Sequence, residues 1–91
     1  MDATGKKDGE YTASAESLHG PFVVTCTVKD EKITDIRIDE GRENMFMTDE
    51  QLASYIKTII DGQSLDVDVI TGATIDSEGI VSAIQLAFSR K

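Results

Sequence analysis

One short stretch of the 91-residue chain combines hydroxyl side chains with a backbone suited to an anion. Thr71 and Thr74 flank Gly72 and Ala73, directly after a β-branched run and directly before a helix-like pattern. The first amides of a helix have no intrahelical partner, and the helix dipole favours negative charge there. These residues therefore predict a phosphate site at a helix N-terminus. The alternative is an ordinary helix cap, with Thr74 or Asp76 accepting backbone N–H bonds.

Other side chains that could do chemistry are sparse. The chain has one cysteine, Cys26, in an apolar β-branched run, and one histidine, His19, beside a Gly-Pro pair. A lone cysteine forms neither an internal disulfide nor a zinc site, so Cys26 is predicted to be a small buried apolar residue. His19 is predicted to be an exposed turn residue. Without a nucleophile–base pair or a metal-ligand cluster, the sequence disfavours a small cytosolic enzyme and predicts no metal site.

The charge and hydropathy of the chain disfavour several classes of partner. A net charge of −8 opposes binding to nucleic acid or to an anionic membrane surface. No stretch approaches the roughly 20 apolar residues of a membrane span, and the polar first residues do not form a signal peptide. The length predicts one small domain, residues 10–91, after a flexible segment, residues 1–9.

Alternating apolar residues predict three strands, at residues 11–16, 22–28 and 33–39. Their inward-facing residues are Tyr11, Ala13 and Ala15, then Phe22, Val24, Cys26 and Val28, then Ile36 and Ile38. A turn signal at residues 19–21 and a polar turn at Asp30 and Glu31 connect the strands. The expected arrangement is an antiparallel meander with one solvent-exposed face.

Two helices and a further strand are expected after this meander. Thr48 and Gln51 fit a capping box, apolar residues then recur at helical spacing, and Gly62 is placed to end the helix. Residues 65–70 alternate between apolar and acidic, which predicts a short fourth strand. A second helix is expected from residue 75 or 76 almost to the end of the chain. The predicted fold class is α+β, a small antiparallel sheet with both helices on one face.

A loop at residues 40–47 interrupts these patterns and contains three consecutive apolar residues, Met45, Phe46 and Met47. They could plug the edge of the core. They could also form a soft wall against a planar ligand, because methionine and phenylalanine pack well on aromatic rings.

The pattern Asp68-x-x-Thr71-Gly72-Ala73-Thr74 resembles the Asp-x-x-[Ser/Thr]-Gly-Ala-Thr signature of the FMN-binding domain family. Four further segments resemble that family's segments in the same order, at residues 8–13, 20–25, 32–36 and 63–68. The resemblance therefore covers nearly the whole chain. The family occurs in subunits of sodium-translocating NADH:quinone oxidoreductases and Rnf-type complexes, and in fumarate-reductase-like and other extracytoplasmic flavoproteins.

The resemblance implies an electron-transfer module in which a flavin transferase uses FAD to attach FMN to Thr74 through a phosphoester. The cofactor-binding residues that it implies are Thr74, Thr71, Gly72, Ala73, Ser77 and Asp68, with Met45 and Phe46 facing the flavin. The implied partners are the transferase and a redox protein or membrane electron-transport complex. The implied location is extracytoplasmic or at the cell surface, with membrane association through a segment absent from this chain.

The chain departs from the family pattern in two places. Asp76 stands two residues after Thr74, where the family usually carries Ser or Thr, and Ser77 follows it. Two unit charges about 5 Å apart repel by roughly 1 kcal/mol in water and about 3 kcal/mol at an effective dielectric of 20, which would weaken attachment. Residues 43–46 also lack the Pro and Gly of the family's loop. The alternative function is a flavin-free or non-covalent ligand-binding or interaction domain of the same fold.

Overall fold

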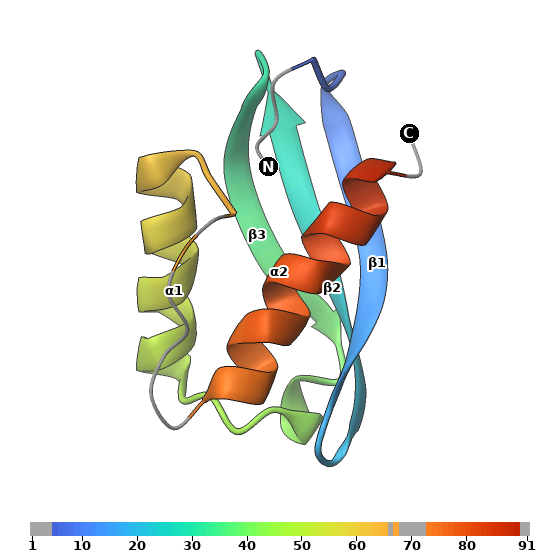
Figure 1. The fold of residues 1–91 in the computed structure, drawn as a ribbon, viewed down its shortest axis with the longest axis vertical. Helices are drawn as coiled ribbons and strands as arrows, with labels where there is room; N and C mark the ends of the chain where they lie inside the picture. The colour runs from blue at the N-terminus through green and yellow to red at the C-terminus, as the bar shows by residue number, and fades with distance from the viewer. Residues whose placement is uncertain (1–4, 66, 68–72, 90–91) are drawn as a thin grey trace.

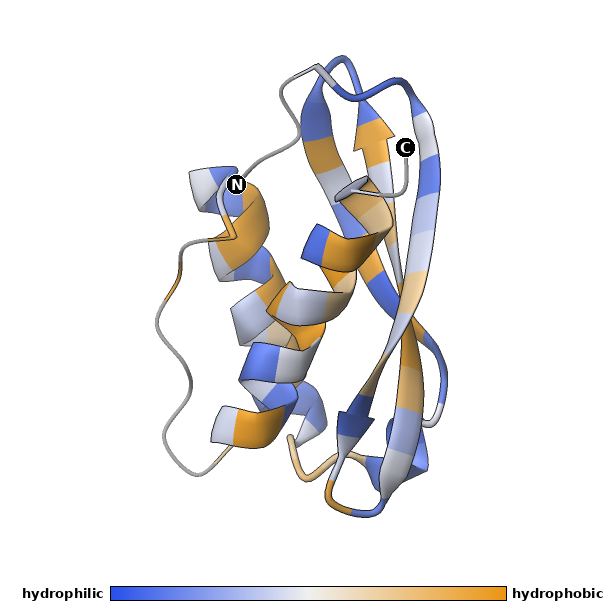
Figure 2. Cartoon of the chain, turned by 45° about the vertical axis from the view of Figure 1, so that its right-hand side comes forward, coloured by the Kyte–Doolittle hydropathy of each residue, from blue (hydrophilic) through white to orange (hydrophobic). Residues whose placement is uncertain are grey.

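A three-stranded antiparallel sheet carries two α-helices on one face, as Figure 1 and Figure 2 show. The computed structural model describes residues 5–65, 67 and 73–89. Its elements in chain order are β1 (Gly9–Ser17), β2 (Gly20–Lys29), β3 (Lys32–Glu40), the 3-10 helix η1 (Arg42–Asn44), α1 (Asp49–Gly62) and α2 (Thr74–Ser89). The predicted α+β class is confirmed.

The strands pair in the order β1-β2-β3, with the apolar residues of each strand facing the helices. In the first hairpin Ser17 pairs with Gly20, so the turn consists of Leu18 and His19 and begins earlier than predicted. The second turn holds Asp30 and Glu31 at φ values of 54° and 60°. Two left-handed residues are what a two-residue hairpin turn of type I′ requires, and this turn matches the twist of the flanking strands.

Helix α1 begins as the sequence predicts, and its left-handed C-cap is Gln63, one residue after the predicted Gly62. The Gln51 backbone N–H donates to Thr48 Oγ1 at 3.1 Å, and the Thr48 N–H donates to Gln51 Oε1 at 3.0 Å. These two bonds are the capping box. The helix ends at Gly62, and the left-handed Gln63 that follows turns the chain back toward β3.

The predicted fourth strand is wrong in the described part of residues 65–70, where Leu65 and Val67 form no strand. Gln63 supplies a physical reason. Its Oε1 accepts the Ile33 N–H and its Nε2 donates to the Ile33 carbonyl, both at 2.7 Å. The side-chain amide therefore occupies the β3 edge groups that a neighbouring strand would use. Leu65 is nevertheless buried in the core, so this residue is buried without strand pairing.

The core lies between the sheet and the two helices. Helix α2 packs mainly on β1, and the Phe88 ring meets Tyr11 edge to face with 5.2 Å between ring centroids. Gly79 lets α2 approach β2, because an added Cβ would lie 2.8 Å from Phe22 Cζ. Cys26 is fully buried, and burial raises its thiol pKa to about 12. This residue is therefore a core residue, as predicted, and not a reactive thiolate.

The other face of the sheet carries a polar network centred on Arg37. Its guanidinium donates to Glu10 Oε2 at 2.9 Å and to Asp39 Oδ1 at 2.7 Å, and the Thr25 hydroxyl donates to the second oxygen of Asp39. The Arg37 hydrogen bond holds the pKa of Glu10 below its ordinary value. The pKa of Asp39 is lowered first by the Thr25 hydroxyl and then by Arg37.

These contacts make a prediction about acid titration. Thr25→Val should raise the pKa of Asp39 and leave that of Glu10 in place, whereas Arg37→Leu should raise both. Because both pKa values are lowered by folding, the charged carboxylates favour the folded state above their ordinary pKa range. This contribution is lost as the pH falls through the lowered values. Carboxyl-carbon NMR titration measures both groups, and a shift of Glu10 in Thr25→Val would contradict the assignment.

Candidate functional site

The site is built around the first turn of α2, where the predicted phosphate-binding stretch meets the helix. Thr74 is the first helical residue and is exposed, so α2 begins slightly earlier than predicted. The Ala73 carbonyl accepts the Ser77 N–H at 3.0 Å and the Ser77 hydroxyl at 2.8 Å. Ala73 and Ser77 are both buried, so the turn is fixed from the inside while Thr74 faces outward.

A cavity of about 280 Å³, here called the Thr74 pocket, adjoins this turn. Its lining residues are Leu18, Phe46, Ala73, Thr74, Ile75 and Asp76. Leu18 is 69% exposed, Phe46 48% and Ile75 43%. Three large apolar side chains left open beside a hydroxyl are suited to a ligand with an aromatic ring and a polar end.

The apolar loop divides its residues between the core and the Thr74 pocket. Met45 and Met47 are buried in the core, whereas Phe46 lies outward and its ring sits 4.6 Å from the His19 ring, centroid to centroid. The core-plug interpretation therefore holds for the two methionines, whereas contact of Phe46 with a planar ligand stays a prediction. The methionines plug the core, and Phe46 is a wall of the pocket.

Asp76 is buried, with 1% of its surface exposed, and its carboxylate binds two other segments. Oδ1 accepts the Ser17 hydroxyl at 2.6 Å, at the end of β1. Oδ2 accepts the backbone N–H groups of Phe46 and Met47 at 2.6 and 2.8 Å. Donor dipoles aimed at a carboxylate offset part of its charge, so Asp76 would repel an anion beside this turn less strongly than a bare carboxylate would.

The structure brings together some of the predicted site residues. Thr74, Ala73 and Phe46 line one pocket, while Met45 and Ser77 are buried. Thr71, Gly72 and Asp68 lie outside the described residues. The pocket also contains Leu18 and Ile75, which the sequence analysis did not identify as site residues. An apolar leucine at a hairpin tip, where polar residues are usual, was the available signal.

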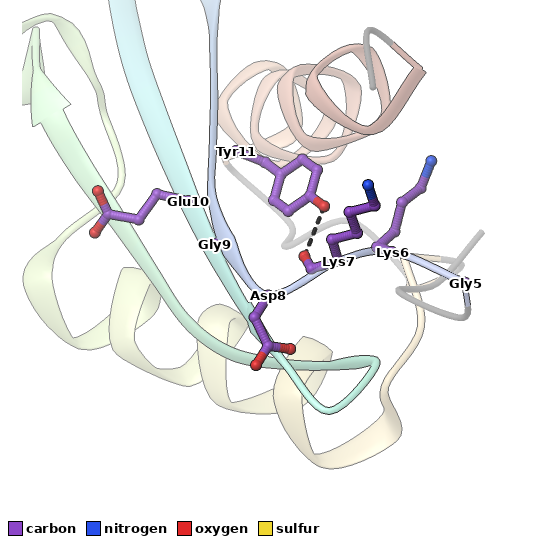
Figure 3. Close-up of a pocket in the computed structure, with 7 residues that line it drawn as sticks. All are labelled: Gly5, Lys6, Lys7, Asp8, Gly9, Glu10 and Tyr11. Atoms are coloured by element: carbon purple, nitrogen blue, oxygen red, sulfur yellow. Dashed lines mark hydrogen bonds between the residues drawn. The ribbon is translucent and has the colours of Figure 1, made fainter.

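A larger cavity of about 430 Å³ lies at the opposite end of the molecule, along residues 5–11. Figure 3 shows the Tyr11 hydroxyl directed at the Lys7 carbonyl, to which it donates at 2.7 Å. Lys6 Nζ donates to the Phe88 carbonyl at 2.8 Å, near the C-terminal end of α2, where the helix dipole favours a cation. These contacts hold the N-terminal segment on the domain, and none of the predicted site residues lines this cavity.

Two negative findings apply to the part of the chain that the structure describes. Within it, no group of three or more His, Cys, Asp or Glu residues could hold a metal ion. No helix in the same part is long and apolar enough to cross a membrane.

Comparison with known proteins identifies a family and longer relatives. Residues 18–89 match the FMN-binding domain. The chain is 35% identical to the NADH:acrylate oxidoreductase of Vibrio harveyi over 79 residues. This aligned stretch covers 87% of this chain and 8% of that protein. An uncharacterized protein of Treponema pallidum (strain Nichols) is 29% identical over 79 residues, 87% of this chain and 22% of that protein.

A solved structure supports the fold independently. The crystal structure of the CPE2226 protein from Clostridium perfringens superposes with a TM-score of 0.66 at 26% identity, covering 93% of this chain and 91% of that one. The chain thus spans nearly all of a solved relative but less than a quarter of the two longer proteins.

Proposed function

Because the chain belongs to the FMN-binding domain family, we propose that it is an electron-transfer module that carries FMN through a phosphoester on the Thr74 hydroxyl. The observation that carries the proposal is the position of Thr74, an exposed hydroxyl residue in the first turn of α2, on the rim of an apolar pocket. The oxidoreductase of Vibrio harveyi, which contains a similar stretch, supports a redox role.

The described residues fit the two ends of FMN. The phosphate is an anion, and the first turn of a helix offers amides and a dipole that favour one. The ring system is planar and largely apolar, and Leu18, Phe46 and Ile75 leave apolar surface open beside Thr74. Bound FMN would supply the electron transfer, while the protein supplies position and electrostatics.

Attachment requires a flavin transferase and FAD as co-reactants. The Thr74 oxygen attacks the phosphorus on the FMN side of the FAD pyrophosphate. One oxygen–phosphorus bond forms, the pyrophosphate bond breaks, and AMP leaves with the proton of the hydroxyl. Nothing is oxidised or reduced in this step, so the part of the chain is to present the Thr74 hydroxyl to the transferase at the protein surface.

The proposal extends to location and partners. Attachment at an extracytoplasmic or cell-surface site would require the transferase and FAD there, with the domain held at a membrane through a segment outside these residues. A redox protein or a membrane electron-transport complex would then be the electron donor or acceptor. Fractionation of cells that express the native protein tests the location, and recovery in the cytosolic fraction would contradict it.

Co-expression with a flavin transferase tests the attachment. We expect the intact mass to rise by one FMN less one water, and the protein to show flavin absorption. Thr74→Ala should abolish the adduct, and Thr74→Ser should keep it because the hydroxyl remains. Thr58→Ala removes an exposed threonine of α1 and should label fully.

A colourless protein of unchanged mass would overturn covalent attachment. Titration with free FMN then separates the two remaining alternatives. Quenching of flavin fluorescence would indicate a non-covalent FMN site in the Thr74 pocket. Unchanged fluorescence at high protein concentration would favour a flavin-free interaction domain that uses the same exposed apolar residues.

A further inference from the structure

We propose that Asp76 is a positioning residue of the flavin site, which holds the Phe46 ring at a fixed place beside Thr74. The inference rests on the proposed function, since Phe46 and Thr74 form the FMN site there. Asp76 is also one of the two places in which this chain departs from the family pattern. The buried carboxylate gives this departure a physical role.

The hydrogen bonds of Asp76 define the backbone on both sides of Phe46. The N–H groups of Phe46 and Met47 belong to the two peptide planes that flank the Phe46 Cα atom. A single carboxylate oxygen, Oδ2, accepts both, at 2.6 and 2.8 Å. Rotation about either backbone bond of Phe46 would break one of these contacts, so Asp76 sets the direction of the Phe46 Cα–Cβ bond.

The neighbours of Phe46 make this restraint more effective. Met45 and Met47 are buried in the core, so the ends of the short segment are anchored while the ring between them is 48% exposed. An exposed aromatic ring without such a restraint would sample several positions. The carboxylate and the buried methionines fix the backbone from which the ring projects, which reduces the number of positions open to it.

Asp76 also ties this loop to the attachment residue. It lies two residues after Thr74 in the first turn of α2, and its other oxygen accepts the Ser17 hydroxyl at the end of β1. Ser17 adjoins the turn that carries Leu18 and His19. One buried side chain therefore connects the three segments that surround the Thr74 pocket.

Amide hydrogen exchange on the flavin-free chain tests the restraint directly. In Asp76→Ala, exchange at Phe46 and Met47 should accelerate about tenfold or more relative to the amide of Ile59, which is buried in α1. Ser17→Ala is the matched control, because it removes the Oδ1 contact and keeps both contacts of Oδ2. In Ser17→Ala the exchange rates of the Phe46 and Met47 amides, relative to that of Ile59, should equal those of the parent chain.

Asp76→Asn is the conservative variant. Its amide oxygen can accept both backbone N–H groups while its NH₂ donates to the Ser17 hydroxyl, which can also accept. Neutral hydrogen bonds are weaker than charge-assisted ones, so protection of Phe46 and Met47 should fall between the parent and Asp76→Ala. Equal exchange in Asp76→Ala and Ser17→Ala would overturn the restraint.

The flavin gives the second readout. Visible circular dichroism of the FMN-loaded protein reports how firmly the ring system is held in an asymmetric environment. We expect the signal to fall toward that of free FMN in Asp76→Ala, to recover in Asp76→Asn and to be unchanged in Ser17→Ala. An unaltered signal in Asp76→Ala would overturn the positioning role. A parent chain that takes up no FMN would instead overturn the proposed function, while the exchange result alone decides whether Asp76 restrains Phe46.

Discussion

The Gly41→Ala variant is expected to be about 2–5 kcal/mol less stable than the parent chain, as urea unfolding would measure. Gly41 has a φ of 81°, in the left-handed region that L side chains rarely adopt. A Cβ at this position would lie 2.2 Å from the Pro21 carbonyl oxygen and 2.6 Å from Phe22 Cα. Both atoms belong to the backbone of β2, so neither can move aside as the end of a flexible side chain would.

The damage should extend to the Thr74 pocket. Gly41 directly precedes η1, and in η1 Asn44 Nδ2 donates to the Pro21 carbonyl at 2.7 Å. The chain continues from η1 into Met45, Phe46 and Met47, so a shift of Gly41 would move the residue that lines the pocket. Gly62→Ala is the control, because nothing lies within 4 Å of its added Cβ and its φ is not positive. It should be about 0.5–1 kcal/mol more stable, since alanine loses less backbone entropy in a helix. Gly41→Ala with the stability of the parent would show that the loop can move without cost.

The parts of the fold that the sequence predicts are those set by residues close together in the chain. The period-two alternation in the strands and the Thr48–Gln51 capping box depend on neighbours within a few positions, and both are confirmed. One missed detail, the start of the first turn, is also local. The first turn begins at Leu18, because Pro21 can start a strand and need not occupy the turn.

The contacts of Asp76 could not be predicted in the same way. Its partners are Ser17, Phe46 and Met47, which lie 59, 30 and 29 residues away in the sequence. No local pattern encodes which segments will meet at a helix start. The sequence therefore indicated a charge near the proposed phosphate, whereas the folded chain surrounds that charge with donors.

The fourth strand illustrates the opposite error, a local pattern overruled by a distant side chain. Leu65 and Val67 alternate with acidic residues, as a half-buried strand would. The Gln63 side-chain amide already hydrogen-bonds to the backbone N–H and carbonyl of Ile33 at the edge of β3. Leu65 is therefore buried without backbone hydrogen bonds to a neighbouring strand at Ile33. Met45 and Met47 are buried and Phe46 between them is exposed, which is the same alternation with a period of two. This alternation is not predicted when residues 40–47 are interpreted as a loop.

The same chemical change, phenylalanine to alanine, should have opposite consequences at Phe22 and at Phe46. Phe22 is 1% exposed and packs against α2 at Gly79, whereas Phe46 is 48% exposed. Phe22→Ala should cost about 3–5 kcal/mol, a large share of the 5–15 kcal/mol typical of a domain. Phe46→Ala should change stability by less than about 1 kcal/mol, because about half of the residue is already exposed to water.

The effect on the affinity for FMN should be the reverse: among folded molecules, Phe46→Ala should weaken FMN binding more than Phe22→Ala does. With attachment blocked by Thr74→Ala, loss of the Phe46 ring should weaken FMN binding about two- to tenfold, the range expected for one aromatic contact. Urea unfolding and FMN titration on the same preparations separate the two effects. If Phe46→Ala unfolded as readily as Phe22→Ala, Phe46 would be a core residue and not a wall of the pocket. If the Phe46→Ala variant bound FMN with unchanged affinity, the flavin ring would contact only Leu18 and Ile75 among the large apolar residues of the pocket. Asp76 would then have no role in positioning a flavin contact through Phe46.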